Sequence, residues 1–520
     1  MFGAPPDRAP NEKLRQNPDS GRNISQHKLP VSTNSHSGGE VARHSLVYII
    51  GSVISVIGGM LMVPVYTHAL SPSDYGLLDT ILRFVTMCMG VAFLGIRQAY
   101  QRLYFDKRTA AHDRTLTATV VLANFAVTIA VLFPLLILGS LVGRTLGASQ
   151  LTVLRSIALA AWVAFEATYM IGLSYLQVRL QSRQFVIAQS VRLLLLITIN
   201  IVLLRLFHLG LNGALAGNLA ASVLSGSFTA TVLLRSAGLR ISTKLLKEIV
   251  AFGLPYIPTV IFAYIIGNAD RLALIHFGAM ASLGLLALAA KIGELALMVF
   301  VGPVDNVWSP YAFSVFSDAN GPKKIGLLYT KIVAMCVFMA LGASLAAPIG
   351  VSLLTHSGYE FASRLVPIIA LGWVFNVLTM LSEIGILIAK KTWMKPLASG
   401  LASVVAVALQ LLLTPRFGVI GAAVATALTN MAFFLIVRTI SQRLYPMTTR
   451  PRDLLIIVVA GALPLLVGAN LSYAYPSLWV SLVASFFALL TYGGVLFRTG
   501  IIERADVGFI ASRLGIRLGT

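Results

Sequence analysis

Charge is scarce in this sequence. Only 11% of its 520 residues are Asp, Glu, Lys or Arg, and 57% are hydrophobic, whereas ordinary soluble proteins carry roughly 25% charged residues. So small a supply of polar groups cannot cover a soluble surface, and lipid must therefore solvate much of the chain. This excludes a secreted scaffold, a cytosolic enzyme and a disordered regulator. The composition predicts a polytopic membrane protein.

Cysteine is nearly absent, and the familiar catalytic motifs are missing. Cys88 and Cys336 both lie in apolar stretches, which predicts inert core thiols with no disulfide and no role in metal binding. The sequence contains no Walker phosphate loop, no Cys–His cluster and no loop long enough for a soluble catalytic domain. We therefore predict no catalytic residues, no cofactor and no metal site. Any transport must then use an ion gradient, the substrate gradient or another protein.

Apolar runs of about 20 residues, the length that crosses a bilayer, recur along the chain. We predict an all-α fold with about fourteen transmembrane helices at 45–69, 77–99, 117–141, 153–175, 185–207, 212–234, 249–275, 282–305, 327–349, 363–388, 397–413, 418–437, 454–471 and 477–497. Runs of this length are not strands of a lipid-facing barrel, which would alternate every second residue. The polar residues 1–43 predict a disordered N-terminal tail, and 498–520 form a second tail.

Basic residues are divided unevenly between alternate loops. One set of loops holds nineteen Lys and Arg, while the other holds only Arg144, Arg205 and Arg416. Because cytoplasmic loops retain positive charge, the richer set and both termini are predicted to be cytoplasmic. The net charge of +21 is spread over loops and tails with no recognition motif, so we predict no nucleic-acid partner.

Short motifs repeat in the chain with an offset of 208 residues. The matched glycines are Gly76 with Gly284, Gly210 with Gly418, and Gly213 with Gly421. Six predicted spans separate each pair, so the two copies have the same orientation in the membrane. We therefore predict two pseudo-symmetric six-helix lobes, 44–240 and 241–440, followed by two extra C-terminal helices in 441–497.

Two cations inside the predicted spans are related by this offset. Arg83 in the second span corresponds to Lys291 in the eighth, and Asp79 and Glu294 share a helix face with them. Two interpretations stay open. Asp79–Arg83 and Lys291–Glu294 are self-neutralising pairs within each helix, or the two cations bind an anionic substrate at the seam between the lobes.

Further polar residues lie in the fourth, fifth and seventh spans. Asn268, Asp270 and Arg271 form a cluster near the outer end of the seventh span. Because adjacent residues on a helix point about 100° apart, we expect Asp270 and Arg271 not to face each other. Glu166 and Arg192 are lone charges, and we predict that they pair across helices.

Several stretches resemble a known family. They are 70–76 (LSPSDYG), 95–104 (GIRQAYQRLY), 253–258 (GLPYIP), 268–271 (NADR), 305–313 (DNVWSPYAF) and 385–391 (GILIAKK). Together they resemble the polysaccharide biosynthesis, oligosaccharide flippase (Wzx-like) family of the multidrug/oligosaccharidyl-lipid/polysaccharide exporter superfamily. The resemblance extends from about residue 44 to 440.

The resemblance implies a V-shaped bundle of two lobes around a cationic cavity. By alternating access it would carry an undecaprenyl-diphosphate-linked oligosaccharide across the bacterial inner membrane for exopolysaccharide, capsule or O-antigen synthesis. Candidate diphosphate-binding residues are Arg83, Lys291, Arg97 and Arg271. Candidate ion-coupling residues are Asp79, Asp270 and Glu294, and Asn268 is a candidate polar residue of the cavity. Membrane lipids, a polysaccharide polymerase and the export machinery are the expected partners.

Other functions remain open at the level of sequence. A drug exporter or a peptidoglycan-precursor flippase of the same superfamily would keep the fold and change the cargo. An integral-membrane polysaccharide polymerase or ligase would be an enzyme, and it would need a larger outer loop than the dozen or so residues predicted here. A non-transporting scaffold would tolerate neutralisation of Arg83 and Lys291. The sugar and the coupling ion are not encoded in any motif.

Overall fold

The computed structural model describes residues 58–93, 100, 103–104, 112–128, 153–179, 181–253, 257–355, 358–474 and 478–502. These residues are helical with short connections, and none of them forms a strand. They all belong to one compact unit of the chain, Leu46–Thr520. The all-α prediction is therefore confirmed for the described part of the chain.

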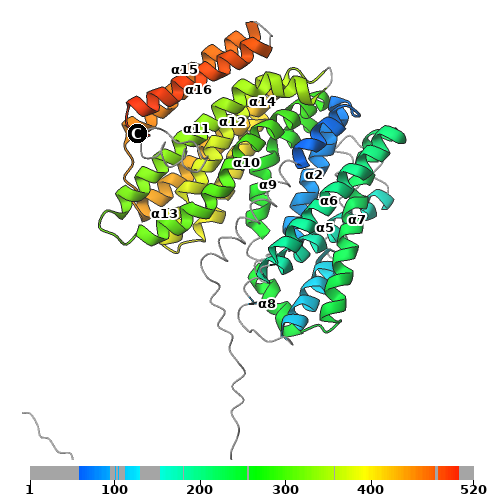
Figure 1. Cartoon of the computed structure of the whole chain (residues 1–520). Coiled ribbons are helices and arrows are strands. Elements are labelled where there is room, and N and C mark those ends of the chain that lie inside the picture. Colours follow the sequence, from blue (N-terminus) through cyan, green and yellow to red (C-terminus); the bar gives the residue numbers. More distant parts are fainter. Residues whose placement is uncertain are drawn as a thin grey trace, which may run out of the picture. The chain divides into compact units, whose positions relative to one another are not determined.

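The helices of the described residues are labelled in Figure 1. They are α2 (Pro72–Phe93), α5 (Val153–Val178), α6 (Ser182–Ile201) with a π-helical turn (Val202–Leu206), α7 (Gly210–Ala237), α8 (Thr243–Gly253), α9 (Ile257–His276), α10 (Met280–Val315), α11 (Gly321–Leu354), α12 (Ala362–Ser382), α13 (Ile384–Ile388), α14 (Met394–Leu444), α15 (Pro451–Ala474) and α16 (Leu478–Arg498). Residues 58–67 and 112–128 are also helical.

Seven helices of the described residues are long and apolar enough to cross a membrane. Large apolar side chains stay exposed along them, for example Leu194, Val404 and Leu411, each more than half exposed. In a membrane protein such side chains contact lipid. The chain is therefore a multi-pass membrane protein, and the total of fourteen spans stays a prediction.

The start of α2 is determined by its local sequence. The backbone N–H of Asp74 donates to Ser71 Oγ at 3.2 Å, and Ser71 Oγ donates to Asp74 Oδ2 at 2.9 Å. Pro72 occupies the first helical position, where its missing N–H leaves no intrahelical bond unmade. This reciprocal cap explains why the motif at 70–76 ends one segment and begins a helix.

Two glycines related by the repeat make the closest helix crossing. A Cβ added to Gly284 of α10 would lie 1.8 Å from Pro72 O, and one added to Gly76 of α2 would lie 2.5 Å from Gly284 N. Only glycine permits this approach of backbone to backbone. Residues that contact their own repeat partner lie beside the axis relating the copies, so this crossing supports the repeat found in the sequence.

The repeat also appears in backbone conformation. Gly210 and Gly418 both have a positive φ, 53° and 58°, which glycine adopts without strain. Gly213 lies against Leu209 Cβ, and Gly421 lies against the equivalent Phe417 Cβ. Each half therefore turns sharply at the same position. At Gly418 the backbone is non-helical, so α14 consists of two helical segments, which correspond to the predicted spans at 397–413 and 418–437.

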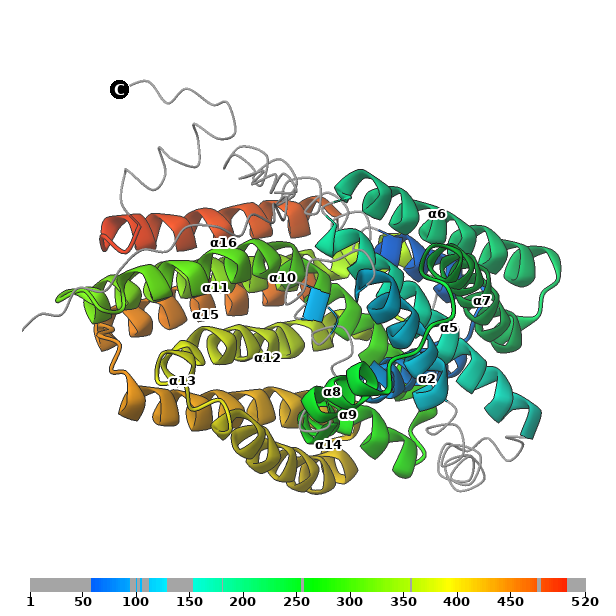
Figure 2. The same ribbon diagram turned by 90° about the horizontal axis from the view of Figure 1, so that it is seen from below.

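Helices α15 and α16 pack against each other and both contact α11 (Figures 1 and 2). Tyr492 of α16 is fully buried there and donates from its hydroxyl to Ala334 O at 2.8 Å. Gly461 of α15 lies against Val337 of α11. The C-terminal pair is therefore anchored to α11.

The predicted span at 249–275 is wrong in its boundaries. Helix α8 ends at Gly253 and α9 begins at Ile257, so two separate helices take its place. Thr243–Gly253 is strongly amphipathic and Pro258 lies in the first turn of α9, where proline is tolerated. Cys88 and Cys336 are buried and free, as predicted.

Candidate functional site

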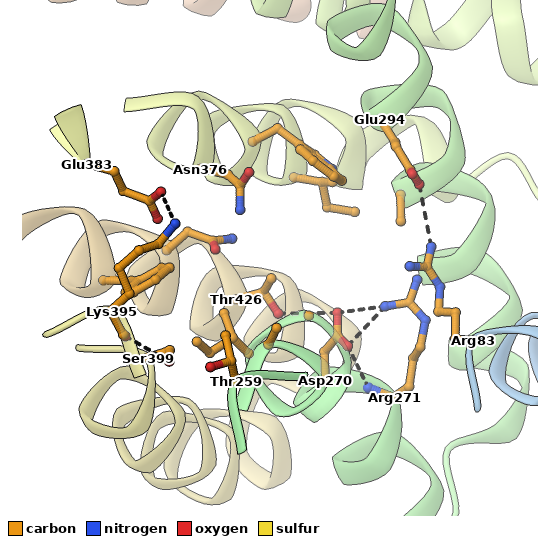
Figure 3. A pocket seen from close by; sticks show the side chains of 18 residues that line it. Arg83, Thr259, Asp270, Arg271, Glu294, Asn376, Glu383, Lys395, Ser399 and Thr426 are labelled. Atoms are coloured by element: carbon orange, nitrogen blue, oxygen red, sulfur yellow. Dashed lines mark hydrogen bonds and ion pairs between the residues drawn. The ribbon is translucent and has the colours of Figure 1, made fainter. Parts of the chain in front are cut away.

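A cavity of about 320 Å³ lies among α9, α10, α12 and α14, and Arg83 of α2 closes one side of it. The wall from α9 follows a helical face, with Ala263, Gly267 and Asp270 at spacings of four and three. Figure 3 shows charged groups at both ends, with uncharged polar groups between them. Six charged residues line this cavity, and they are described next.

Arg83 joins α2 to α10. Its Nε donates to Asp79 Oδ2 at 3.0 Å, and its Nη2 lies 3.6 Å from Glu294 Oε2 (Figure 3). The side chain of Arg83 is 27% exposed, so it also faces the cavity. The predicted i, i+4 pair of Asp79 and Arg83 is therefore confirmed, and a second carboxylate comes from the other half of the repeat.

Arg271 shares the Asp79 carboxylate with Arg83, but it is buried. Its side chain is 3% exposed, and its Nε donates to Asp79 Oδ2 at 2.8 Å. Its Nη1 donates to Asp270 Oδ1 at 3.0 Å, so the expectation that these neighbours do not face each other is wrong. The long arginine side chain folds back along the helix and reaches the adjacent carboxylate. Its Nη2 is buried and has no hydrogen-bond partner.

Asp270 connects this network to α14. Thr426 Oγ1 donates to Asp270 Oδ2 at 3.2 Å, and Gln410 Nε2 donates in turn to Thr426 Oγ1 at 3.1 Å. Gln410 Nε2 also donates to Ala422 O, and its own Oε1 accepts from Thr414 at 2.6 Å. The two segments of α14 on either side of Gly418 are thus held together by the same chain of hydrogen bonds that ends at Asp270.

Lys291 differs from every other predicted cation that the structure describes. It makes no ion pair and no hydrogen bond with the described residues, and it does not line the cavity. Its Nζ would lie 3.7 Å from a Cβ added to Gly59, so the side chain extends from α10 to the helix at 58–67. The predicted pair of Lys291 with Glu294 is therefore wrong, because Glu294 turns to Arg83 instead.

The opposite end of the cavity holds a second ion pair. Lys395 Nζ of α14 lies 2.6 Å from Glu383 Oε2, at the junction of α12 and α13. The side chains are 37% and 21% exposed, so the pair is accessible from the cavity. Figure 3 shows Asn376 and Thr259 between this pair and the Arg83 end.

Comparison with known protein families shows to which family the chain belongs. The sequence model described as "Polysaccharide biosynthesis protein" matches residues 41–316, more than half of the chain. The chain belongs to this family. The match includes Asp79, Arg83, Asp270, Arg271, Lys291 and Glu294.

Solved structures show the same fold as this family member. A lipid II flippase MurJ in an inward closed conformation is 16% identical, with a TM-score of 0.70 over 88% of this chain and 100% of that chain. A multidrug resistance MATE family transporter of the MOP superfamily is 15% identical in its inward-facing conformation, with a TM-score of 0.61 over 75% and 94%. Its outward-facing conformation gives 0.54 at 15% identity over 79% and 96%. A search of curated proteins finds no significant match.

The cavity of this family member is balanced in charge. The charged residues among its described lining are three cations and three anions, Arg83, Arg271, Lys395, Asp270, Glu294 and Glu383. The cationic cavity implied by the resemblance therefore does not describe this space, since each cation there lies beside a carboxylate. Lys291, which has no ion-pair partner among the described residues, lies outside this cavity and extends toward the helix at 58–67.

Two predicted site residues are not part of this arrangement. Arg97 lies outside the described residues. Asn268 is buried and donates to Tyr264 O at 2.9 Å instead of lining the cavity. Sequence reasoning missed Trp373, Asn376 and Asn430, which do line it. Counting amides as well as ionisable groups inside the apolar spans would have drawn attention to both asparagines.

Proposed function

We propose that this protein is a flippase that carries undecaprenyl-diphosphate-linked oligosaccharide repeat units across the bacterial inner membrane. The repeat units would serve exopolysaccharide, capsule or O-antigen synthesis. Membership of the polysaccharide biosynthesis family supports the pathway, and a fold like that of a lipid II flippase supports a lipid-linked cargo. In this proposal the protein is a carrier and not an enzyme, and a polymerase and export machinery act after it.

One observation carries the proposal. Arg83 and Lys291, at equivalent positions of the repeat, extend from α2 and α10 across the seam, and Lys291 has no anionic partner among the described residues. A cation held at membrane depth without a counter-ion is costly. A diphosphate entering the seam would supply that counter-ion to Lys291. It would compete with Glu294 for Arg83, because phosphate oxygens match the guanidinium fork.

We propose that the two halves are lobes, 44–240 and 241–440, that rock against each other, with 441–497 as an added helix pair. Contacts between them support closure at the end predicted to be outer. Thr67 Oγ1 donates to Leu354 O at 2.8 Å, and Tyr359 Oη donates to Leu70 O at 3.3 Å. Opening that end would break these bonds and the glycine crossing of α2 with α10. In this proposal both termini are cytoplasmic.

The carboxylates give this carrier a route to ion coupling. Asp79, Asp270 and Glu294 each form an ion pair with an arginine in the described state. If the diphosphate draws Arg83 away, Asp79 and Glu294 each lose a positive neighbour, and a coupling cation could take its place. We propose that substrate binding and ion uptake are linked through this exchange of partners.

Polysaccharide export tests the proposal. A deletion strain is complemented with the wild type, Arg83→Ala, Lys291→Ala and the double variant at matched membrane levels. We expect the double variant to lower export at least about a hundredfold, since each lost charge-assisted contact is worth about tenfold or more. Lipid-linked repeat units should accumulate on the cytoplasmic leaflet.

Normal export from the double variant would contradict the flippase proposal at this site and favour a scaffold. A different result is expected if the protein is a polymerase or ligase. Deleting it would then leave repeat units accumulating on the outer leaflet, because flipping would continue without polymerisation.

A further inference from the structure

The cavity between the two ion pairs has a lining suited to an uncharged polar molecule. Its cations and anions are equal in number, so it gives no net attraction to a diphosphate or to a cationic drug. Between the charged ends, the described walls present Trp373, Phe433 and Ile266 together with amides and a hydroxyl. Apolar and aromatic walls with a few fixed polar groups are typical of ligand sites.

The amides of the cavity are unusual because they are free. Asn376 and Asn430 make no side-chain hydrogen bond with the described residues, although each carries two donors and an acceptor. Asn124, Asn218 and Gln410, which lie elsewhere in the helices, all donate to protein oxygens. Figure 3 shows the Asn376 amide directed into the cavity. Asn376 is exposed and Asn430 is half-buried, so both amides are open to a molecule that enters the cavity.

Thr259 adds a third free group to this lining. Its hydroxyl lies in the first turn of α9 and makes no hydrogen bond with the described residues. The indole of Trp373 lines the same space and is half-buried. Its face offers an apolar surface that accepts C–H groups.

We propose that this cavity is a sugar-binding subsite, in which Trp373 packs against one pyranose ring while Asn376, Asn430 and Thr259 exchange hydrogen bonds with its hydroxyl groups. This inference rests on the proposed function, because the sugar is the part of the cargo next to the diphosphate. The diphosphate lies toward Arg83 and Lys291, and the glycan extends toward Lys395 and Glu383. The C-terminal half thereby selects the glycan, and the seam cations select the diphosphate.

Gly267 provides a way to fill the subsite without disturbing the fold. It lines the cavity on α9, and a Cβ added there meets no atom within 4 Å. Leucine also has a better helix propensity than glycine. Gly267→Leu therefore places a side chain in the cavity while leaving every described ion pair intact. Gly350→Leu in α11 is the matched control, because Gly350 also has open space and does not line the cavity.

The test measures binding of two lipids to the full chain in nanodiscs. One is undecaprenyl diphosphate, and the other is the same lipid carrying the repeat unit, extracted from the deletion strain. We expect the wild type and Gly350→Leu to bind the glycan-bearing lipid at least about tenfold more tightly. Gly267→Leu should bind both lipids equally, with its affinity for undecaprenyl diphosphate unchanged.

A second variant tests the hydrogen bonds separately from the space. Asn376→Ala combined with Asn430→Ala removes the free amides without removing any bond made in the protein. We expect it to reduce the preference for the glycan-bearing lipid about tenfold or more. Asn320→Ala is its matched control, since Asn320 is an exposed asparagine at the start of α11. Its preference should equal that of the wild type.

The outcomes separate the subsite from the proposed function. If Gly267→Leu and the double asparagine variant keep the wild-type preference, the sugar subsite is overturned. If undecaprenyl diphosphate binds equally well to the wild type and to Arg83→Ala with Lys291→Ala, the diphosphate site fails instead. In a further experiment, the oligosaccharide released from its lipid is added as a competitor of the glycan-bearing lipid. This shows whether the sugar binds without the lipid. Competition in the wild type but not in Gly267→Leu supports the subsite, and equal competition in both overturns it.

Discussion

Polar side chains of the N-terminal half bond to one another, whereas several of those in the C-terminal half are left open to a cavity. In the N-terminal half, residues 58–253, Glu166 accepts from Arg192 and from Ser222 Oγ at 2.7 Å. Asn218 donates to Tyr66 Oη at 2.8 Å. In the C-terminal half, residues 257–444, Asn430 is at the position equivalent to Ser222 and makes no such bond.

The difference teaches that a polar residue in an apolar helix has two uses. Arg192 stacks over the Tyr169 ring, with the guanidinium carbon 4.9 Å from its centroid, and it fixes α6 to α5. In that network the guanidinium and the carboxylate are paired with each other, although Tyr169 Oη has no hydrogen-bond partner among the described residues. The asparagines of the cavity leave their hydrogen-bonding capacity for an incoming molecule. Polar groups that line a cavity and have no partner in the fold are therefore the candidates for ligand binding.

Breaking the closed network should have the largest effect on stability. Glu166→Ala leaves the half-buried Arg192 without its carboxylate, and we expect a loss of about 3 kcal/mol. Thermal unfolding of the purified protein and its level in the membrane measure this loss. Glu166→Leu combined with Arg192→Leu should recover most of the stability, because no uncompensated charge remains. A single variant that melts like the wild type would contradict the structural role of this pair.

The corresponding change at the cavity should cost less. Asp270→Ala leaves Arg271 with Asp79 as a remaining carboxylate partner, so we expect about 1–3 kcal/mol. The same melting experiment compares it directly with Glu166→Ala. Asp79→Ala combined with Asp270→Ala removes both partners and should approach the N-terminal value. If Asp270→Ala is as destabilising as Glu166→Ala, Asp79 does not act as a second carboxylate partner of Arg271.

The smallest effects should separate bound from free amides. Asn218→Ala removes a bond to Tyr66 and one to Ala214 O at 2.8 Å, and we expect a loss of about 1 kcal/mol. Asn376→Ala removes none and should stay within about 0.5 kcal/mol of the wild type. Unfolding temperatures in the same detergent give both values. Equal losses would show that the Asn376 amide is part of the fold.

Much of the fold follows from local sequence. Apolar runs predict helices because every backbone polar group in lipid must be bonded within its own segment. The Ser71–Asp74 cap and the positive φ at Gly210 and Gly418 are likewise local. The boundaries at 249–275 were missed because hydropathy continues through the junction of α8 and α9, and hydropathy does not register where a helix is interrupted.

The sequence indicated several charged residues of the site but not which of them form ion pairs. Arg83, Asp79 and Asp270 stood out as charges at membrane depth, and the structure brings them together with Arg271 and Glu294 in one network. Asn376 and Asn430 were overlooked because an amide has little effect on hydropathy. Their freedom from partners is visible only once neighbouring helices are in place.

The sequence by itself determined a helical membrane protein, the repeat that relates Arg83 to Lys291, and the glycine positions at which the repeats turn and cross. These properties depend on spacing along one helix or on composition. Only the tertiary structure decided that Glu294 turns to Arg83, that Lys291 is left unpaired, and that α9, α12 and α14 enclose a charge-balanced cavity. Helical spacing states which residues share a face, but partners on different helices depend on how those faces are rotated and packed.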